Sequence, residues 1–249
     1  MDVRVDGQGP AEPFLGARDL FATERRLSRP VQVRIVEDPD ERTRVSHDET
    51  GHRLTISRAA ATSAMARELA LHEFAHMHHH ETAHPSHTQD TAEAIFLALA
   101  GRSVEQRKLT HVHQIANHMK DIYADDLWLE VAPADKLVAF LESSLAAAVA
   151  DRPRDSRPWA RLTPAADPEI TAVNAAFALA IVERHDLVDD DHRLYDLAHA
   201  AALDAPAVDL AGFKRRFRSL EREPDESAFR KALVDVTRAY VCSDGRAAD

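Results

Sequence analysis

The sequence feature that most constrains this chain is the run Leu71–Met77, which contains the motif His72-Glu73-Phe74-Ala75-His76, an HExxH pattern. Residues 59–71 hold good helix formers and neither Gly nor Pro, so the motif is predicted to lie inside a helix. Residues four apart in a helix are separated by about 40° around its axis. The two imidazoles therefore lean toward one place and can share a metal ion. Glu73 projects about 100° away from His72 and can reach a water molecule on the open side of that ion.

The motif is short, and its context decides how much weight it carries. A chain of 249 residues with 15 His is expected to contain about 0.06 such motifs by chance. Apolar residues cover much of the circumference of the predicted helix, which indicates a central rather than a surface helix. They are Met65, Leu69, Leu71, Phe74 and Met77. The alternative is a buried helix in which both histidines have ordinary hydrogen-bond partners and bind no metal.

Composition excludes several classes of function. The net charge of −11 argues against a nucleic-acid binder and against binding to acidic membranes, because no basic excess is available. Cys242 is the single cysteine, which excludes an internal disulfide and a cysteine-based zinc site, so a metal must be held by His and carboxylates. We find no secretory signal, and no apolar run approaches the roughly 20 residues of a membrane span. We therefore expect a cytoplasmic protein.

The pattern along the chain predicts a mainly α fold of the α+β class. Residues 1–11 are expected to be disordered and residues 12–26 to form a short amphipathic helix. Residues 31–36 and 52–57 are rich in β-branched side chains and are predicted to form a small two-stranded ribbon packed on the HExxH helix. Such a ribbon either holds an extended peptide by strand addition or only covers the helix.

Beyond the motif the chain is helical by pattern. Helices are predicted at about 90–100, 103–127, 135–150, 169–186, 189–204, 208–222 and 225–241. Four prolines within residues 151–168 indicate an irregular connector. We therefore expect a metal-binding catalytic domain at 1–150, a Pro-rich connector at 151–168 and a helical C-terminal subdomain at 169–249.

Five histidines follow the motif closely: His78, His79, His80, His84 and His87. The favoured interpretation is that histidines at the C-terminus of a helix complement its dipole, before Pro85 leads the chain out. The alternative is a second metal site or a histidine-rich metal reservoir. His79 lies within about 20° of His72 around the helix and is the one most able to join the site. The metzincin pattern is absent, because it requires Gly at position 79 and His at position 82.

A catalytic zinc site usually has three protein ligands and one open position, so the motif needs a third ligand. Two acidic residues compete for this role: Glu93 follows His76 by 17 residues and Asp121 follows it by 45. The spacing of Glu93 is close to that of thermolysin-like and aminopeptidase zincins, but the Asn-Glu pair of those families is missing. Asp121 belongs to a polar stripe that adjoins a buried helix face, where polar groups are costly unless paired or coordinated.

The segment from His72 to Asp125 resembles zincin-like metallopeptidases, in which HExxH is followed much later by a carboxylate and then by Asp or Asn four residues on. In the membrane-linked CAAX-protease and HtpX-like zincins the second element is ExxxD. Here Asn117, Asp121 and Asp125 form an NxxxDxxxD element, which is similar to an uncharacterised zincin-like family of salt-loving archaea. The resemblance covers about a fifth of the chain. Asp in place of Glu shortens the reach of the ligand, and the membrane helices of the membrane-linked relatives are missing.

The resemblance implies that Asp121 is the third ligand. It also implies that Asp125, with Asn117, does not bind the metal itself but orients the ligand side chains. The expected cofactor is one Zn²⁺ ion per chain. The expected activity is hydrolysis of a peptide or protein substrate by a metal-bound water, with Glu73 as general base. The alternative is a catalytically silent zincin-like protein that binds metal for regulation or for interaction with a partner.

Overall fold

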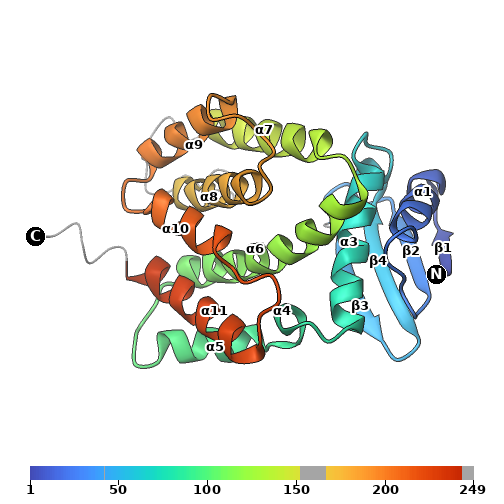
Figure 1. Ribbon diagram of the computed structural model, residues 1–249, viewed down its shortest axis with the longest axis horizontal. Helices are drawn as coiled ribbons and strands as arrows, with labels where there is room; N and C mark the ends of the chain where they lie inside the picture. The colour runs from blue at the N-terminus through green and yellow to red at the C-terminus, as the bar shows by residue number, and fades with distance from the viewer. Residues whose placement is uncertain (42, 152–166, 243–249) are drawn as a thin grey trace, which may run out of the picture. The chain divides into compact units, whose positions relative to one another are not determined.

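The computed structural model describes residues 1–41, 43–151 and 167–242 (Figure 1). These residues form two compact units. The N-terminal unit comprises Met1–Thr88 and Tyr123–Lys136, and the C-terminal unit comprises Gln89–Ile122 and Leu137–Asp249. Helix α6 (Gln106–Val131) contributes to both units. The domains at 1–150 and 169–249 stay a prediction. Most of the predicted connector at 151–168 lies outside the described residues.

The N-terminal unit contains a four-stranded sheet of order β1-β2-β4-β3. Strand β2 pairs in parallel with both β1 and β4, and β3 pairs antiparallel with β4. The strands are β1 (Val3–Asp6), β2 (Val31–Val36), β3 (Arg44–Asp48) and β4 (Gly51–Ser57).

The sheet corrects two sequence predictions. The segments 31–36 and 52–57 are strands, but they pair in parallel rather than as a two-stranded ribbon. Residues 1–11, expected to be disordered, contain β1. Four residues are too few for a clear alternation pattern, and this strand is defined by its pairing with β2.

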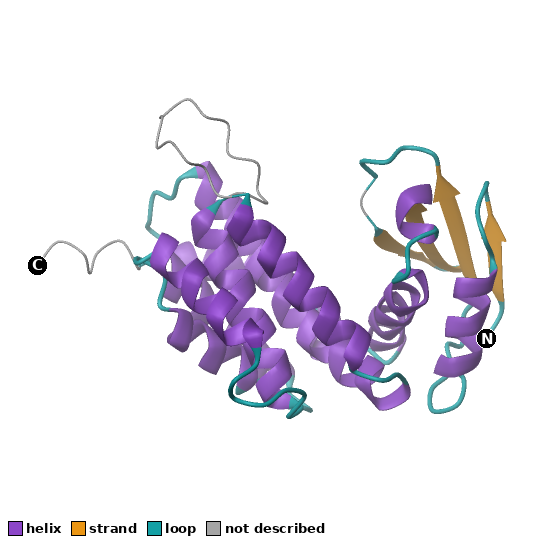
Figure 2. Ribbon diagram, turned by 90° about the horizontal axis from the view of Figure 1, so that it is seen from above, coloured by secondary structure: helices purple, strands orange, loops and turns teal. Residues whose placement is uncertain are grey.

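One face of the sheet is apolar and covered. Along β2, Val31, Val33 and Ile35 are buried, whereas Gln32 and Arg34 are exposed. Helices α1 (Glu12–Phe21) and α3 (Ala66–Glu81) pack against each other, and Figure 2 shows both on the same side of the sheet. The apolar side of the strands therefore faces these helices, and the polar side faces solvent.

Helix α3 carries the HExxH motif, as predicted, and lies in the core of the N-terminal unit. Leu71, Phe74 and Met77 are fully buried, and the ring of Phe74 lies 6.1 Å from that of Phe21 in α1. The expected long helix from residue 59 is broken into α2 (Arg58–Ala61) and α3. The side chain of Ser57 accepts a hydrogen bond from the backbone N–H of Ala60, which starts α2 as a separate turn.

The C-terminal unit is helical, and helix α8 (Pro168–Arg184) is its most buried element, with apolar residues on all sides of the helix. Helix α8 packs against α9 and α10, and α5 packs against α11 (Figure 1). Asp90, Asp167, Asp209 and Asp225 cap the N-termini of four of these helices. The helices are α5 (Thr91–Leu99), α7 (Asp135–Ala150), α8 (Pro168–Arg184), α9 (Arg193–Asp204), α10 (Leu210–Arg218) and α11 (Glu226–Val241), and the first residues of α7 belong to the N-terminal unit.

These positions agree with the predicted helices to within a few residues, and the mainly α class with a small N-terminal sheet is confirmed. None of the described helices has the length and apolar character needed to cross a membrane.

Candidate metal centre on helix α3

Helix α3 places His72 and His76 one turn apart with their rings facing each other. The Nε2 atoms of the two imidazoles are 3.0 Å apart, and the ring centroids are separated by 4.6 Å. Two nitrogen ligands of a tetrahedral zinc ion, each about 2.0–2.1 Å from the metal, lie about 3.3–3.4 Å from each other. The two Nε2 atoms are thus within a few tenths of an ångström of the spacing of zinc ligands.

A buried carboxylate binds Nδ1 of His72, the ring nitrogen that does not face His76. Nδ1 of His72 donates to Oδ1 of Asp125 over 2.8 Å, and the side chain of Asp125 is 4% exposed. An ionised carboxylate only accepts hydrogen bonds, so the proton of neutral His72 sits on Nδ1 and the lone pair of Nε2 faces His76. The indole of Trp128, one turn further along α6, lies edge-on to His72 at 6.4 Å.

Another histidine, His87, contacts Nδ1 of His76, the ring nitrogen that does not face His72. Nδ1 of His76 lies 2.8 Å from Nε2 of His87, in the short helix α4 (Pro85–Thr88). The hydroxyl of Ser86 connects Nδ1 of His87 with Nδ1 of His84, at 2.7 Å from each. When His76 donates from Nδ1, its Nε2 lone pair faces His72.

His84 and His87 are predicted to complement the helix dipole or, as the alternative, to bind a second metal, and neither prediction includes this orienting position. No spacing rule predicts it, because the chain reverses through a left-handed residue, Ala83, at a φ of 53°.

Glu73 is half-buried on the same turn as His72. Among the residues that the structure describes, its carboxylate has no hydrogen-bond or ion-pair partner. The neighbouring Glu68, in contrast, is buried and bound by Arg67 and Lys136. The carboxylate of the motif is therefore not committed to a structural contact.

The predicted residues outside the N-terminal unit are placed as follows. Asp121 is half-buried one turn before Asp125 on the same face of α6, and its carboxylate lies 3.5 Å from Nδ1 of His118. Asn117 is exposed one turn earlier on the same helix. Glu93 is exposed in the first turn of α5, and it belongs to none of the described groups of three side chains that could hold a metal ion.

His79, the histidine judged most able to join the site, is in none of the described groups of three side chains that could hold a metal ion. It is buried, its Nε2 donates to the backbone oxygen of Tyr123 over 3.0 Å, and its ring packs against His84. Burial lowers the pKa of His79 to about 4. The small angle between His79 and His72 around the helix is offset by two turns of rise, about 10 Å along the axis.

The C-terminal unit contains its own buried polar group, formed by His111, Asp167 and Glu169. Arg107 donates to both carboxylate oxygens of Asp167, over 2.6 and 2.8 Å, and the hydroxyl of Tyr240 donates to Glu169 over 2.7 Å. Burial raises the pKa of Asp167, but the hydrogen bonds from His111 and Arg107 outweigh it and hold this pKa well below its usual range. Because a guanidinium already neutralises the carboxylate, the group forms an ion-pair network between α6, α8 and α11 rather than a metal site.

The model of a family of unknown function (DUF5781) matches residues 1–242 of the chain. No curated protein and no solved structure matched the chain. The zincin-like resemblance and the activity that it implies therefore stay predictions.

Proposed function

The chain belongs to this family of unknown function, and we propose that it is a zinc-dependent metallopeptidase in which His72, His76 and Asp121 bind zinc and Glu73 is the general base. The observation that carries the proposal is the pair of Nε2 atoms 3.0 Å apart on one face of α3. The activity, the zinc ion and the peptide substrate are all part of the proposal.

The histidine pair fits a metal because each ring is held by a hydrogen bond at Nδ1, the nitrogen that faces away from the other ring. Asp125 binds Nδ1 of His72, and His87 lies against Nδ1 of His76. With both protons on Nδ1, the two Nε2 atoms, 3.0 Å apart, direct their lone pairs toward the same space, where one cation can accept both. A divalent cation with imidazole affinity satisfies both lone pairs at once.

The continuity of helix α6 supports Asp121 as the third ligand. Asp125 contacts His72, and Asp121 precedes Asp125 by one turn, about 6 Å along the same face. Each of the three proposed ligands offers one ligand atom, an imidazole nitrogen or a carboxylate oxygen. Two histidines and one carboxylate are a donor set typical of catalytic zinc, which leaves one position for solvent or substrate.

Zinc bound by these ligands would supply a Lewis acid that lowers the pKa of a water molecule toward about 7 and polarises a peptide carbonyl. The chain's own residues supply the rest. The uncommitted carboxylate of Glu73 takes a proton from the attacking water and delivers it to the leaving amine. Asp125 fixes the tautomer of His72, and His87 can accept the Nδ1 proton of His76 when Nε2 of that ring binds zinc.

The test is the Glu73→Gln variant, which keeps the size of the side chain and removes its basicity. We expect the wild type to cleave casein or itself, and the variant to lose at least about 100-fold in rate with unchanged zinc content. Glu24→Gln, at an exposed position, is the matched control and is expected to cleave like the wild type. Equal activity of Glu73→Gln and wild type would remove Glu73 from catalysis.

The alternative function, a catalytically silent metal-binding protein that interacts with a partner, draws support from a different feature. Phe96 and Leu97, neighbours on α5, are 73% and 42% exposed, and adjacent exposed apolar side chains are typical of an interaction surface. A wild-type protein that binds zinc in the histidine pair and cleaves no peptide in a mixed-sequence library would favour this alternative.

A further inference from the structure

A second group of histidines lies in the N-terminal unit, apart from the HExxH pair. His47 lies on β3, His52 on β4 and His80 in the last turn of α3. One ligand atom from each of the three lies within 4.8 Å of the other two. His80 follows His76 by one turn of α3, so that His72, His76 and His80 lie along the same side of this helix.

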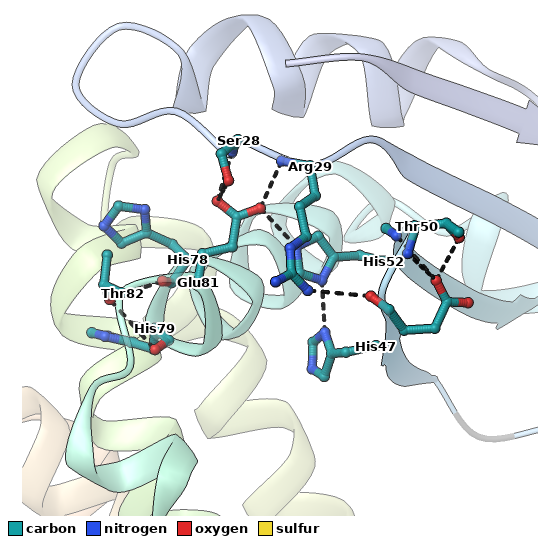
Figure 3. Close-up of polar contacts among 11 residues, drawn as sticks. Ser28, Arg29, His47, Thr50, His52, His78, His79, Glu81 and Thr82 are labelled. Atoms are coloured by element: carbon teal, nitrogen blue, oxygen red, sulfur yellow. Dashed lines mark hydrogen bonds and ion pairs between the residues drawn. The ribbon is translucent and has the colours of Figure 1, made fainter.

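The sheet itself brings two of these histidines together. His47 and His52 are directly opposite each other in the antiparallel pairing of β3 and β4, and their Nδ1 atoms are 2.6 Å apart (Figure 3). Nε2 of His52 donates to Oε1 of Glu81 over 2.8 Å. Because a carboxylate only accepts, neutral His52 carries its proton on Nε2 and turns the lone pair of Nδ1 toward His47.

Glu81 is itself fixed. It accepts hydrogen bonds from the backbone N–H groups of Ser28 and Arg29, at 2.6 and 2.8 Å, and from the hydroxyl of Ser28 at 2.9 Å (Figure 3). Glu81 is thus held in place on both oxygens and orients His52, as a carboxylate orients a metal-binding histidine.

His80 completes the group and has an unsatisfied atom. Its ring stacks on that of His47, with centroids 3.9 Å apart, and its Nδ1 is buried without a hydrogen bond. A buried polar atom without a partner is rare and is commonly explained by a ligand.

We propose that His47, His52 and His80 bind a divalent transition-metal ion such as Zn²⁺, with Glu81 orienting His52. Imidazole nitrogens select zinc, copper and nickel over magnesium and calcium, which prefer oxygen ligands. Zinc ligands lie about 3.3–3.4 Å apart, so the three nitrogens need shifts of roughly 1 Å to coordinate it. The stacked rings of His47 and His80 must also turn, because an imidazole lone pair lies in the plane of its ring. The ion would connect the β3–β4 hairpin to the end of α3. This site does not depend on the peptidase activity proposed for the HExxH pair.

The test is the number of zinc equivalents that the metal-stripped, full-length protein binds in a titration. We expect two equivalents for the wild type and one for His80→Gln. His78→Gln, two residues away on α3 and outside the group, is the matched control and is expected to keep both. Glu81→Gln is expected to weaken one equivalent by about 10–100-fold. Mg²⁺ in excess is not expected to compete.

His47→Gln provides a second route to the same loss if His80→Gln fails to fold, and circular dichroism of the metal-free variants tests folding. The outcome also distinguishes this site from the HExxH site. The wild type could also bind only one equivalent. If His80→Gln then loses it and His76→Gln keeps it, the result supports the inference and counts against the HExxH site. If His80→Gln and His47→Gln bind as many equivalents as the wild type, the inference is wrong.

Discussion

Replacing Asp125 by Asn tests whether the contact to His72 prepares that ring for a metal. The substitution keeps the shape of a side chain that is 4% exposed and keeps an oxygen that can accept from Nδ1 of His72, at present 2.8 Å away. It removes the negative charge. Loss of such an orienting carboxylate typically costs 10–100-fold in metal affinity, about 1.4–2.7 kcal/mol.

We expect the loss to lie near the upper end of that range, for two reasons. Asp125 is buried and His72 is half-buried, so solvent screens the lost charge only weakly. An Asn amide can also turn its NH₂ group toward Nδ1 of His72, which favours the tautomer with the proton on Nε2. That proton would point at His76 and occupy the place of the metal.

The affinity is measured by competition with a chromogenic zinc chelator, in a His80→Gln background so that the second histidine group does not contribute. Asp126→Asn, at the next position of α6, is the control and is expected to bind zinc within twofold of the background. If Asp125→Asn also stays within twofold, or if both variants lose the same affinity, the argument from the His72 tautomer is refuted.

Three further predictions concern the third zinc ligand, the loss of zinc at low pH and the contribution of the buried ion-pair network to stability. In Asp121→Ala the HExxH site should lose its zinc, whereas Glu93→Ala should keep it; the reverse result in metal analysis would overturn the choice of third ligand. Because ligand histidines must be neutral, zinc should leave below about pH 6, and a metal content constant from pH 5 to 8 would contradict this. Asp167→Asn should destabilise the protein by about 1–3 kcal/mol at pH 7. Because the folded-state pKa of Asp167 lies below its ordinary value of 3.8, its contribution is present above pH 3.8 and is lost as the pH falls below it. The difference from wild type in urea unfolding should therefore shrink from pH 4 to pH 2, and a constant difference would count against the network.

The sequence by itself determines the features that depend on neighbours within a turn or two. Helical spacing brings His72 and His76 together, and the apolar pattern around Phe74 places their helix in the core, because both follow from the local geometry of an α-helix. Helices α5, α8, α10 and α11 of the C-terminal unit begin next to Asp residues that cap them, which is also a local effect.

Only the tertiary structure decides which distant segments meet. The parallel pairing of β2 with β4, the approach of His87 to His76 and the grouping of His47 with His80 all join residues from different elements. Their relative positions depend on turns such as the left-handed Ala83 and on how α3 packs against the strands. Sequence patterns predict the type of each helix or strand and the face that it buries, but not which elements lie next to each other. The polar partners that orient the histidines are therefore identified only in the folded chain.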